Sequence, residues 1–195
     1  NNGYVVIKNI LNNNLKNYLI KYFNEIESET ETNINKYLNQ FELTNDHKEA
    51  VLCRTEKIID NHKGMKNIIN YGLIPNLVSK ISNFSVNIYK EKINYKYPNT
   101  GGYRPHQDIT AYPNSKNHTT CLISLCDTNL FNGCLEFSPL KNNSILENKN
   151  GVILNGDKLD WISCPTNFGD IVLFNSYIPH RSGPNKMDKP RKALY

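Results

Sequence analysis

The sequence predicts one mainly β domain, a sandwich or jelly roll with N-terminal helices packed on one face. Three observations carry this prediction. Residues 84–195 alternate short apolar runs with turn residues, residues 1–83 have the apolar spacing of helices, and 195 residues with 38% hydrophobic content can bury one sizeable core. We therefore divide a single domain into a helix-rich N-terminal part (1–83) and a jelly-roll core (84–195).

Two segments of the N-terminal part have the pattern of amphipathic helices. In segment 10–27, apolar side chains recur at intervals of three or four residues, for example at Leu15, Leu19 and Tyr22. Segment 65–82 repeats the pattern more weakly around Pro75. The asparagine-rich stretches between them are interpreted as loops.

Short strands account for most of the second part. Six segments are rich in β-branched and aromatic residues and are bounded by turn residues, which is typical of a sandwich or jelly roll. The asparagine-rich segment 141–157 lies between two of them and is expected to form a flexible lid or rim of the site. The predicted strand segments are 84–97, 119–126, 133–138, 160–165, 169–177 and 191–195.

Composition excludes several classes of function. The net charge of +5 is spread over many lysines without an aromatic-interleaved basic stripe, so no nucleic-acid partner is expected. No apolar run is long enough to span a membrane, and the first residues do not resemble a signal peptide. Five cysteines without a CxxC pair predict neither a disulfide framework nor a zinc site. We expect a cytoplasmic protein that acts on a small molecule.

Segment 101–113, GGYRPHQDITAYP, sets a histidine and an aspartate two residues apart in a loop. By themselves, His106 and Asp108 would be better explained as surface polarity. His180, at the end of a later apolar strand, supplies a second imidazole. Two histidines and one carboxylate form the facial triad that holds non-haem iron(II) and leaves coordination positions open. The three residues are therefore predicted to be the metal ligands and the catalytic centre.

Arg191 follows at the head of the last predicted strand. A dicarboxylic keto acid could chelate such a metal with its keto oxygen and one carboxylate, and oxygen could take the remaining position. The far carboxylate would then need a planar, permanently charged, bidentate partner, which arginine provides and lysine does not. Arg191 is predicted to be that partner.

These residues and their flanking sequences resemble a known family. The HxD segment, followed by HRSGPN (180–185) and PRKAL (190–194), is similar to the phytanoyl-CoA dioxygenase family of iron(II)- and 2-oxoglutarate-dependent oxygenases. The likeness extends from GYVVIKNIL (3–11) to the end of the chain. It implies a double-stranded β-helix, a cupin-like jelly roll, with iron at its mouth. It also implies Fe(II), 2-oxoglutarate and O2 as cofactors, with ascorbate as an activator.

The resemblance also implies residue roles. Arg191 and Ser182 would bind the distal carboxylate of 2-oxoglutarate, and Asn94 would present its amide to the cosubstrate. Because Asp108 is present, where related halogenases have a small residue, hydroxylation is the expected reaction. One departure is FSPLKNN (137–143), where many members have a proline-glycine-serine-histidine turn. This difference leaves the geometry of the following loop open.

Residues that could bind the substrate are found on the first predicted strand of the core. Alternation places Lys90, Lys92, Asn94 and Lys96 on one face. If Asn94 faces the cosubstrate, Lys92 also faces inward, and an inward lysine is costly unless an anion meets it. For Lys90 and Lys96, an outer edge where they prevent strand pairing is an equal alternative.

Further substrate-binding candidates are Arg104 and Arg181, each beside a predicted iron ligand, and Tyr112, whose ring could contact an ammonium group. The alternatives are solvated charges at the rim for the arginines and simple packing for the tyrosine. The remaining histidines have no partner at metal-binding spacing. We predict surface or loop positions for His47 and His62, and also for His118.

The segments 90–96, 105–108, 132–137 and 164–185 are similar to the organophosphonate-hydroxylating branch of the same family. This likeness implies hydroxylation of a small anionic metabolite at the carbon next to phosphorus, with 2-aminoethylphosphonate as the best guess. One alternative is the same chemistry on an amino acid, an acyl thioester or a natural-product intermediate. Others are a non-oxygenase metal-dependent cupin and an inactive binding module. The intact triad with Arg191 argues against an inactive module.

Overall fold

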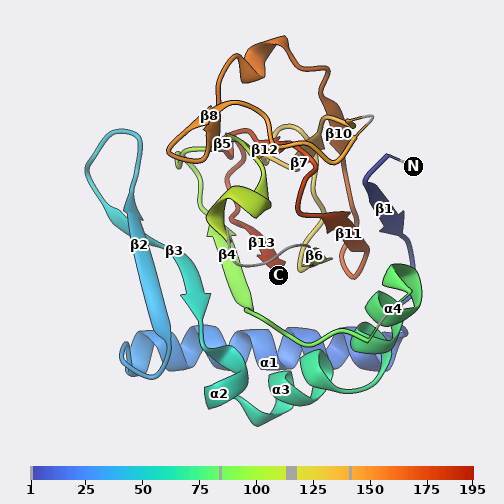
Figure 1. Cartoon of the computed structure of the whole chain (residues 1–195). Coiled ribbons are helices and arrows are strands. Elements are labelled where there is room, and N and C mark those ends of the chain that lie inside the picture. The colour runs from blue at the N-terminus through green and yellow to red at the C-terminus, as the bar shows by residue number, and fades with distance from the viewer. Residues whose placement is uncertain (1, 84, 113–117, 141) are drawn as a thin grey trace.

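The computed structural model describes residues 2–83, 85–112, 118–140 and 142–195. The larger sheet has seven strands in the order β1-β11-β6-β13-β4-β3-β2, and the smaller sheet has six in the order β10-β7-β12-β5-β9-β8. The helices gather along one side of the strands (Figure 1). This architecture confirms the predicted mainly β fold with helices on one face.

The strand bounds show which segments of the sequence build each sheet. The larger sheet contains β1 (Tyr4–Ile7), β2 (Leu38–Leu43), β3 (Ala50–Glu56), β4 (Lys92–Lys96), β6 (Thr119–Ser124), β11 (Ile171–Asn175) and β13 (Arg191–Leu194). The smaller sheet contains β5 (Tyr103–His106), β7 (Leu135–Phe137), β8 (Asn148–Lys149), β9 (Val152–Ile153), β10 (Ile162–Cys164) and β12 (His180–Ser182).

The first predicted helix is α1 (Asn13–Thr32). It begins at Asn12, whose side-chain oxygen accepts a hydrogen bond from the Leu15 backbone N–H at 2.9 Å and so caps the helix. The second predicted helix is divided at Gly72, whose φ of +91° cannot continue a helix. The short helices are α2 (Ile58–Asn61), α3 (Lys63–Asn70) and α4 (Leu73–Ser82), with 3-10 turns η1 (Asp108–Ala111) and η2 (Gly156–Lys158).

Two apolar clusters lie on opposite faces of the larger sheet. On β6, for example, Ile123 belongs to the cluster under the helices, whereas its neighbour Leu122 belongs to the cluster between the two sheets. β11 alternates in the same way, with Ile171 toward the helices and Val172 toward the smaller sheet. This period of two is the strand pattern that the sequence predicted. The face toward the smaller sheet is the interior of the jelly roll.

Two predicted elements differ in the structure. The segment between the helices, interpreted as a loop, contains the β2–β3 hairpin at the edge of the larger sheet. Most β2 side chains are exposed, so its sequence lacks the apolar alternation that would have identified it. The predicted strand 84–97 is shortened to β4; residues 85–91 form no strand, and Phe84 lies outside the described residues.

Segment 141–157, expected to be an irregular lid, contains the β8–β9 hairpin and η2. Val152 of β9 pairs with His106 of β5, so the hairpin extends the smaller sheet beside the HxD segment. Lys141 lies outside the described residues. Among the described helices, none combines the length and apolarity that a membrane span requires.

Candidate metal centre

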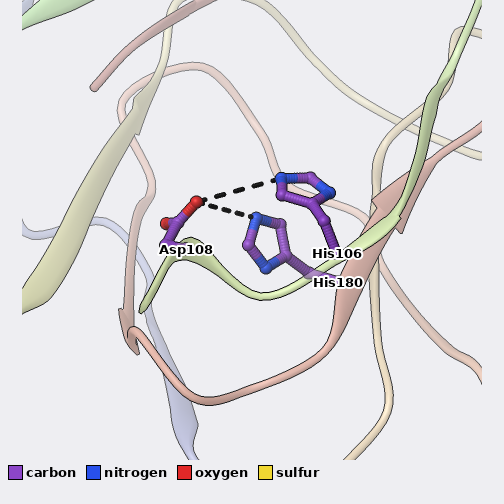
Figure 2. A group of neighbouring side chains, drawn as sticks. All are labelled: His106, Asp108 and His180. Atoms are coloured by element: carbon purple, nitrogen blue, oxygen red, sulfur yellow. Dashed lines mark ion pairs between the residues drawn. The ribbon is translucent and has the colours of Figure 1, made fainter. Parts of the chain in front are cut away.

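His106, Asp108 and His180 are brought together by strand pairing. His106 ends β5 and His180 begins β12, and the two residues are direct partners across the β5–β12 ladder. Asp108 opens the η1 turn immediately after β5. Asp108 Oδ1 lies 3.8 Å from His106 Nε2 and 3.6 Å from His180 Nε2, and the three side chains converge on one point (Figure 2). One donor atom from each residue lies within 4.8 Å of the others, a spacing that one metal ion can bridge.

Backbone carbonyls orient both imidazole rings. His106 Nδ1 lies 2.7 Å from the Arg104 carbonyl oxygen, and His180 Nδ1 lies 3.1 Å from that of Ile178. Each Nδ1 therefore carries the proton and donates it to a carbonyl, which leaves the Nε2 lone pair toward Asp108. This arrangement is typical of histidines that ligate a metal.

The carboxylate is also held in place. Thr120 on β6 donates from its hydroxyl to Asp108 Oδ2 at 2.9 Å, which leaves Oδ1 facing the imidazoles. Burial opposes the ionisation of Asp108, but His180, His106 and the Thr120 hydroxyl outweigh burial and hold the pKa of Asp108 below its ordinary value. Burial and the nearby His106 ring lower the pKa of His180 to about 4. At neutral pH, Asp108 is ionised and His180 is neutral, and these are the metal-binding forms.

Gln107, between the two predicted ligands, points away from them and is 1% exposed. Its amide donates to the Ser144 and Tyr177 carbonyls, and its Oε1 accepts from the Leu146 N–H at 2.8 Å. The side chain thus fastens the HxD segment to two other loops. The local sequence around Gln107 does not predict this role.

A cavity of about 910 Å³ opens onto the three residues. Such a volume lies within the range of roughly 300–1,000 Å³ that is usual for small-molecule sites. Lys92 and Asn94 line the cavity from β4, and Ser182 lines it from β12. Helices α3 and α4 contribute an apolar side to the cavity that includes Ile69 and Ile74.

Arg191 and Lys96 are buried near Ser182 and do not line the cavity. Lys96 Nζ donates to Ser182 Oγ and to the Gly183 carbonyl oxygen, each at 2.6 Å. Arg191 is 2% exposed; one terminal nitrogen donates to the Gly133 carbonyl at 3.1 Å, and its Nε has no hydrogen-bond partner among the described residues. A buried guanidinium with a free donor is expected to bind an anion.

Gly133 makes this arrangement of two cations possible. Its φ is +73°, and a Cβ at this position would overlap the Gly183 carbonyl oxygen and lie 2.9 Å from Lys96 Nζ. The Gly133 carbonyl accepts from both Lys96 and Arg191. The position therefore requires glycine.

The predicted substrate-binding residues fall into two groups. Lys90, Lys92, Tyr112 and Arg181 all line the cavity. Arg181, however, is already engaged, because its guanidinium forms two hydrogen bonds to Glu136 at 3.0 and 3.1 Å and stacks on Trp161. Arg104 is exposed and is not brought to the cavity.

Lys90 and Lys96, for which an outer edge was an equal alternative, both lie on the inner side. Lys90 lines the cavity and forms an ion pair with Glu56 at 2.9 Å, while Lys96 is 2% exposed. Lys92 has no carboxylate within ion-pairing distance among the described residues, although its ammonium lies 5.1 Å from the centroid of the Tyr195 ring. Burial and the positive charge of Arg54 lower the pKa of Lys92 to about 8.

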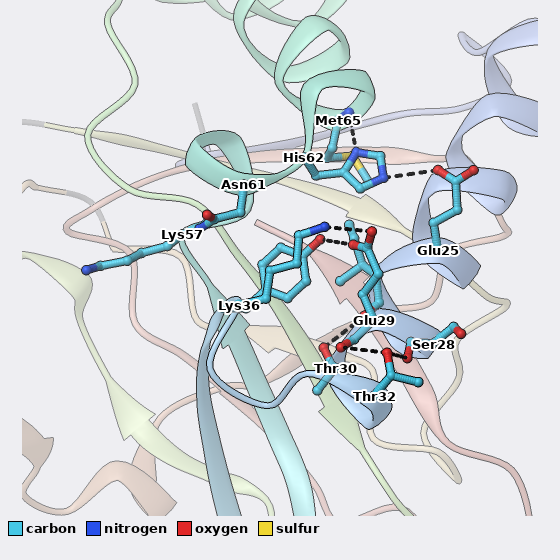
Figure 3. Close-up of polar contacts among 12 residues, drawn as sticks. Glu25, Ser28, Glu29, Thr30, Thr32, Lys36, Lys57, Asn61, His62 and Met65 are labelled. Atoms are coloured by element: carbon cyan, nitrogen blue, oxygen red, sulfur yellow. Dashed lines mark hydrogen bonds and ion pairs between the residues drawn. The ribbon is translucent and has the colours of Figure 1, made fainter.

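Two histidines predicted to lie on the surface are buried in whole or in part. His62 is 8% exposed; its Nδ1 accepts from the Met65 N–H at 3.0 Å at the start of α3, and its Nε2 lies 3.1 Å from Glu25 of α1 (Figure 3). His118 lines the cavity, and neither of its ring nitrogens has a hydrogen-bond partner among the described residues. His47 is exposed, as predicted.

Sequence reasoning also missed Arg54 and Thr120, and it left the inward position of Lys96 as one of two alternatives. Arg54 lies on a strand that was interpreted as a loop, and Thr120 lies on a strand whose partner was unknown. For Lys96, strand alternation gave a partial signal in the sequence, because it placed Lys96 on the same face as Asn94. Alternation fixes the face of a strand but not the neighbour that the face meets.

The chain is similar in sequence to a known enzyme family and to two characterised relatives. The family model described as phytanoyl-CoA dioxygenase (PhyH) matches residues 1–193. A 2-aminoethylphosphonate dioxygenase from an uncultured bacterium, HF130_AEPn_1, is 37% identical over 100% of this chain and 76% of the relative. A methylphosphonate hydroxylase from Gimesia maris is 38% identical over 99% of this chain and 75% of the relative.

Solved structures with the same fold are more distant in sequence. EctD from S. alaskensis, with 2-oxoglutarate and 5-hydroxyectoine, has a TM-score of 0.80 at 15% identity, over 99% of this chain and 70% of that chain. The α-ketoglutarate-dependent carbocyclase SnoK from nogalamycin biosynthesis has a TM-score of 0.78 at 18% identity, over 99% of this chain and 78% of that chain. The jelly-roll expectation is confirmed. This chain belongs to the phytanoyl-CoA dioxygenase (PhyH) family and is an enzyme of the iron(II)- and 2-oxoglutarate-dependent oxygenase class.

Proposed function

We propose that this enzyme hydroxylates a small organophosphonate, such as 2-aminoethylphosphonate, at the carbon next to phosphorus. The observation that carries the proposal is Lys92, which lines the cavity beside the triad and has no carboxylate partner among the described residues. A lysine ammonium in such a position is stabilised by an anionic ligand. The two relatives named for phosphonate oxidation support phosphonate as that anion.

In this proposal, His106, Asp108 and His180 hold iron(II). The donor set fits the metal, since two oriented imidazoles and one ionised carboxylate converge and leave further coordination positions free. With 2-oxoglutarate and O2, iron supplies the oxidising power that replaces a carbon-bound hydrogen by hydroxyl while 2-oxoglutarate becomes succinate and CO2. Ascorbate is expected to sustain activity by keeping the iron reduced.

The residues around Ser182 are proposed to bind 2-oxoglutarate. The free Nε of Arg191 supports binding of the distal carboxylate there, the Ser182 hydroxyl can donate to the same group, and the Lys96 ammonium adds a positive charge beside it. Asn94, which lines the cavity on the strand that carries Lys96, would contact the metal-proximal end of the cosubstrate. The protein thus orients the cosubstrate and shields the reacting centre from water.

Succinate formation tests the proposal. The enzyme is incubated under air with iron(II), 2-oxoglutarate and ascorbate, and succinate is measured with 2-aminoethylphosphonate, methylphosphonate, amino acids, carboxylates or acyl thioesters. Strong stimulation by a phosphonate, with a product hydroxylated next to phosphorus, is expected. Stimulation by another class of compound alone would contradict the phosphonate assignment while retaining the oxygenase chemistry.

A further inference from the structure

We propose that Arg54 is a specificity-determining residue that, together with Lys90 and Lys92, selects a doubly charged phosphonate head over a singly charged sulfonate or carboxylate. The inference rests on the proposed function and deepens it, since it names the feature of the substrate that is recognised. It also assigns a role to the β2–β3 hairpin, which the sequence analysis interpreted as a loop. Arg54 is the residue of that hairpin that lines the cavity.

Strand pairing brings Arg54 to the site. It is the direct partner of Asn94 in the β3–β4 ladder, and its Nε donates to Asn94 Oδ1 at 3.3 Å. Tyr103, which lines the same cavity, lies close enough to Arg54 to help raise the pKa of Arg54. Because the Asn94 oxygen is occupied by Arg54, the amide nitrogen of Asn94 is left to donate elsewhere. Arg54 is therefore held by Asn94 and fixes the orientation of the Asn94 amide.

The positive side chains around Arg54 are not balanced by carboxylates. Arg54, Lys90 and Lys92 all line the cavity. Of the residues that the structure describes, only Glu56 forms ion pairs with them, at 3.5 Å from Arg54 and 2.9 Å from Lys90, and it does not line the cavity. Among the described residues, three cations thus share one ion-paired carboxylate, and the excess positive charge faces the cavity.

The two carboxylates that line the cavity, Asp108 and Glu91, do not remove this excess. Asp108 is directed toward the two imidazoles of the metal centre. Glu91 is 7% exposed, and its Oε1 accepts hydrogen bonds from the Ile58 and Ile59 N–H groups at the start of α2. Neither carboxylate lies within ion-pairing distance of the three cations among the described residues.

An excess of two positive charges matches a dianion. Phosphoryl groups carry about −1.5 to −2 charges near neutral pH, because their second pKa is about 6. A sulfonate has a similar arrangement of oxygens but only one negative charge. It would therefore leave one of the three cations desolvated and without an anionic partner. An arginine contributes a rigid fork of donors that fits two phosphonate oxygens at once, which a lysine cannot reproduce.

The test compares two isosteric ligands, 2-aminoethylphosphonate and 2-aminoethylsulfonate, at about pH 7, above the second phosphoryl pKa of about 6 and below the Lys92 pKa of about 8. Binding to the enzyme loaded with iron(II) and 2-oxoglutarate is measured by anaerobic calorimetry, and succinate formation is measured under air. The variants are Arg54→Gln and Arg54→Lys. Lys48→Gln is the matched control, because Lys48 is an exposed residue of the same hairpin that pairs with Asp46.

Wild-type enzyme and Lys48→Gln are expected to bind the phosphonate much more tightly than the sulfonate. Arg54→Gln should reduce that preference by roughly tenfold to a hundredfold, the usual effect of losing a charged hydrogen-bonding partner. Arg54→Lys should restore only part of it. The iron(II) affinity and the far-UV circular dichroism spectrum should not change in the Arg54 variants, which distinguishes lost selectivity from a misfolded site.

An unchanged phosphonate-to-sulfonate ratio in both Arg54 variants would overturn the proposal, as would a wild-type enzyme that binds the two ligands equally. Failure of the proposed function would look different. In that case, wild-type enzyme would bind the phosphonate selectively, and Arg54→Gln would remove the selectivity, but the phosphonate would not be hydroxylated.

Discussion

Lys96 and Arg191 are direct partners across the β4–β13 ladder, and both are 2% exposed. Among the described residues, neither has a carboxylate within ion-pairing distance. Burial and the charge of Arg191 lower the pKa of Lys96 to about 7. Two adjacent buried cations are unfavourable until an anion joins them. The proposed binding of the distal carboxylate of 2-oxoglutarate near Ser182 would supply that anion.

Binding of 2-oxoglutarate at about pH 8 is expected to take up a proton. With a pKa of about 7, Lys96 is mostly neutral at that pH, and a nearby carboxylate would raise its pKa and protonate it. Calorimetry on the metal-loaded enzyme in buffers of different ionisation enthalpy measures this uptake, which should approach one proton. Lys96→Met should abolish it. A binding enthalpy that is the same in every buffer would contradict the prediction.

Arg191→Ala is expected to weaken 2-oxoglutarate binding by at least about tenfold, because a charge-assisted bidentate contact is lost. Turnover at low 2-oxoglutarate should fall in parallel. Lys192→Gln provides the control, because Lys192 is the next residue on β13 and pairs with Glu27 of α1. Normal 2-oxoglutarate affinity in Arg191→Ala would exclude Arg191 as the partner of the distal carboxylate.

Thr120→Val is expected to lower iron(II) affinity by roughly tenfold to a hundredfold, as is usual when a hydrogen bond to a ligand is removed. The substitution nearly preserves the shape of the side chain but removes the hydroxyl that donates to Asp108 Oδ2. Thr120→Ser keeps the hydroxyl and should retain most of the affinity. Competition with a chelating dye measures both variants, and equal affinities would show that this hydrogen bond does not position Asp108.

Gln107→Leu is expected to lower the free energy of unfolding by about 2 kcal/mol or more, since it leaves buried backbone groups without partners at about 1–3 kcal/mol each. Those groups are the Ser144 and Tyr177 carbonyls and the Leu146 N–H. Urea denaturation measures the effect, with Gln40→Leu on the exposed face of β2 as the control. Equal midpoints for the two variants would contradict a stabilising role of Gln107.

The kcat/KM for the phosphonate is expected to fall as the pH rises above about 8. Burial and Arg54 lower the pKa of Lys92 to about 8, and only its protonated form attracts an anion. A pH profile at saturating 2-oxoglutarate should therefore lose activity on its alkaline side. Arg54→Gln removes a neighbouring positive charge, so it should move that decline to higher pH. A decline at an unchanged pH in the variant would assign it to another group.

The sequence by itself determined the local features of this protein. Asparagine at position 12 and the apolar spacing that follows it specify the start of α1, and period-two alternation specifies the faces of β6 and β11. The HxD spacing and the flanking residues of His180 identified the predicted ligands. These features depend on residues close together in the chain, whose geometry is fixed by backbone periodicity.

Only the tertiary structure decided which distant residues meet. Arg54 contacts Asn94, and Thr120 contacts Asp108, because strands from different parts of the chain pair in one register. The same pairing brought Lys96 beside Arg191 and left Arg104 outside the cavity. The choice of strand partner and register depends on how the whole chain buries its apolar surface, and no short segment contains that information.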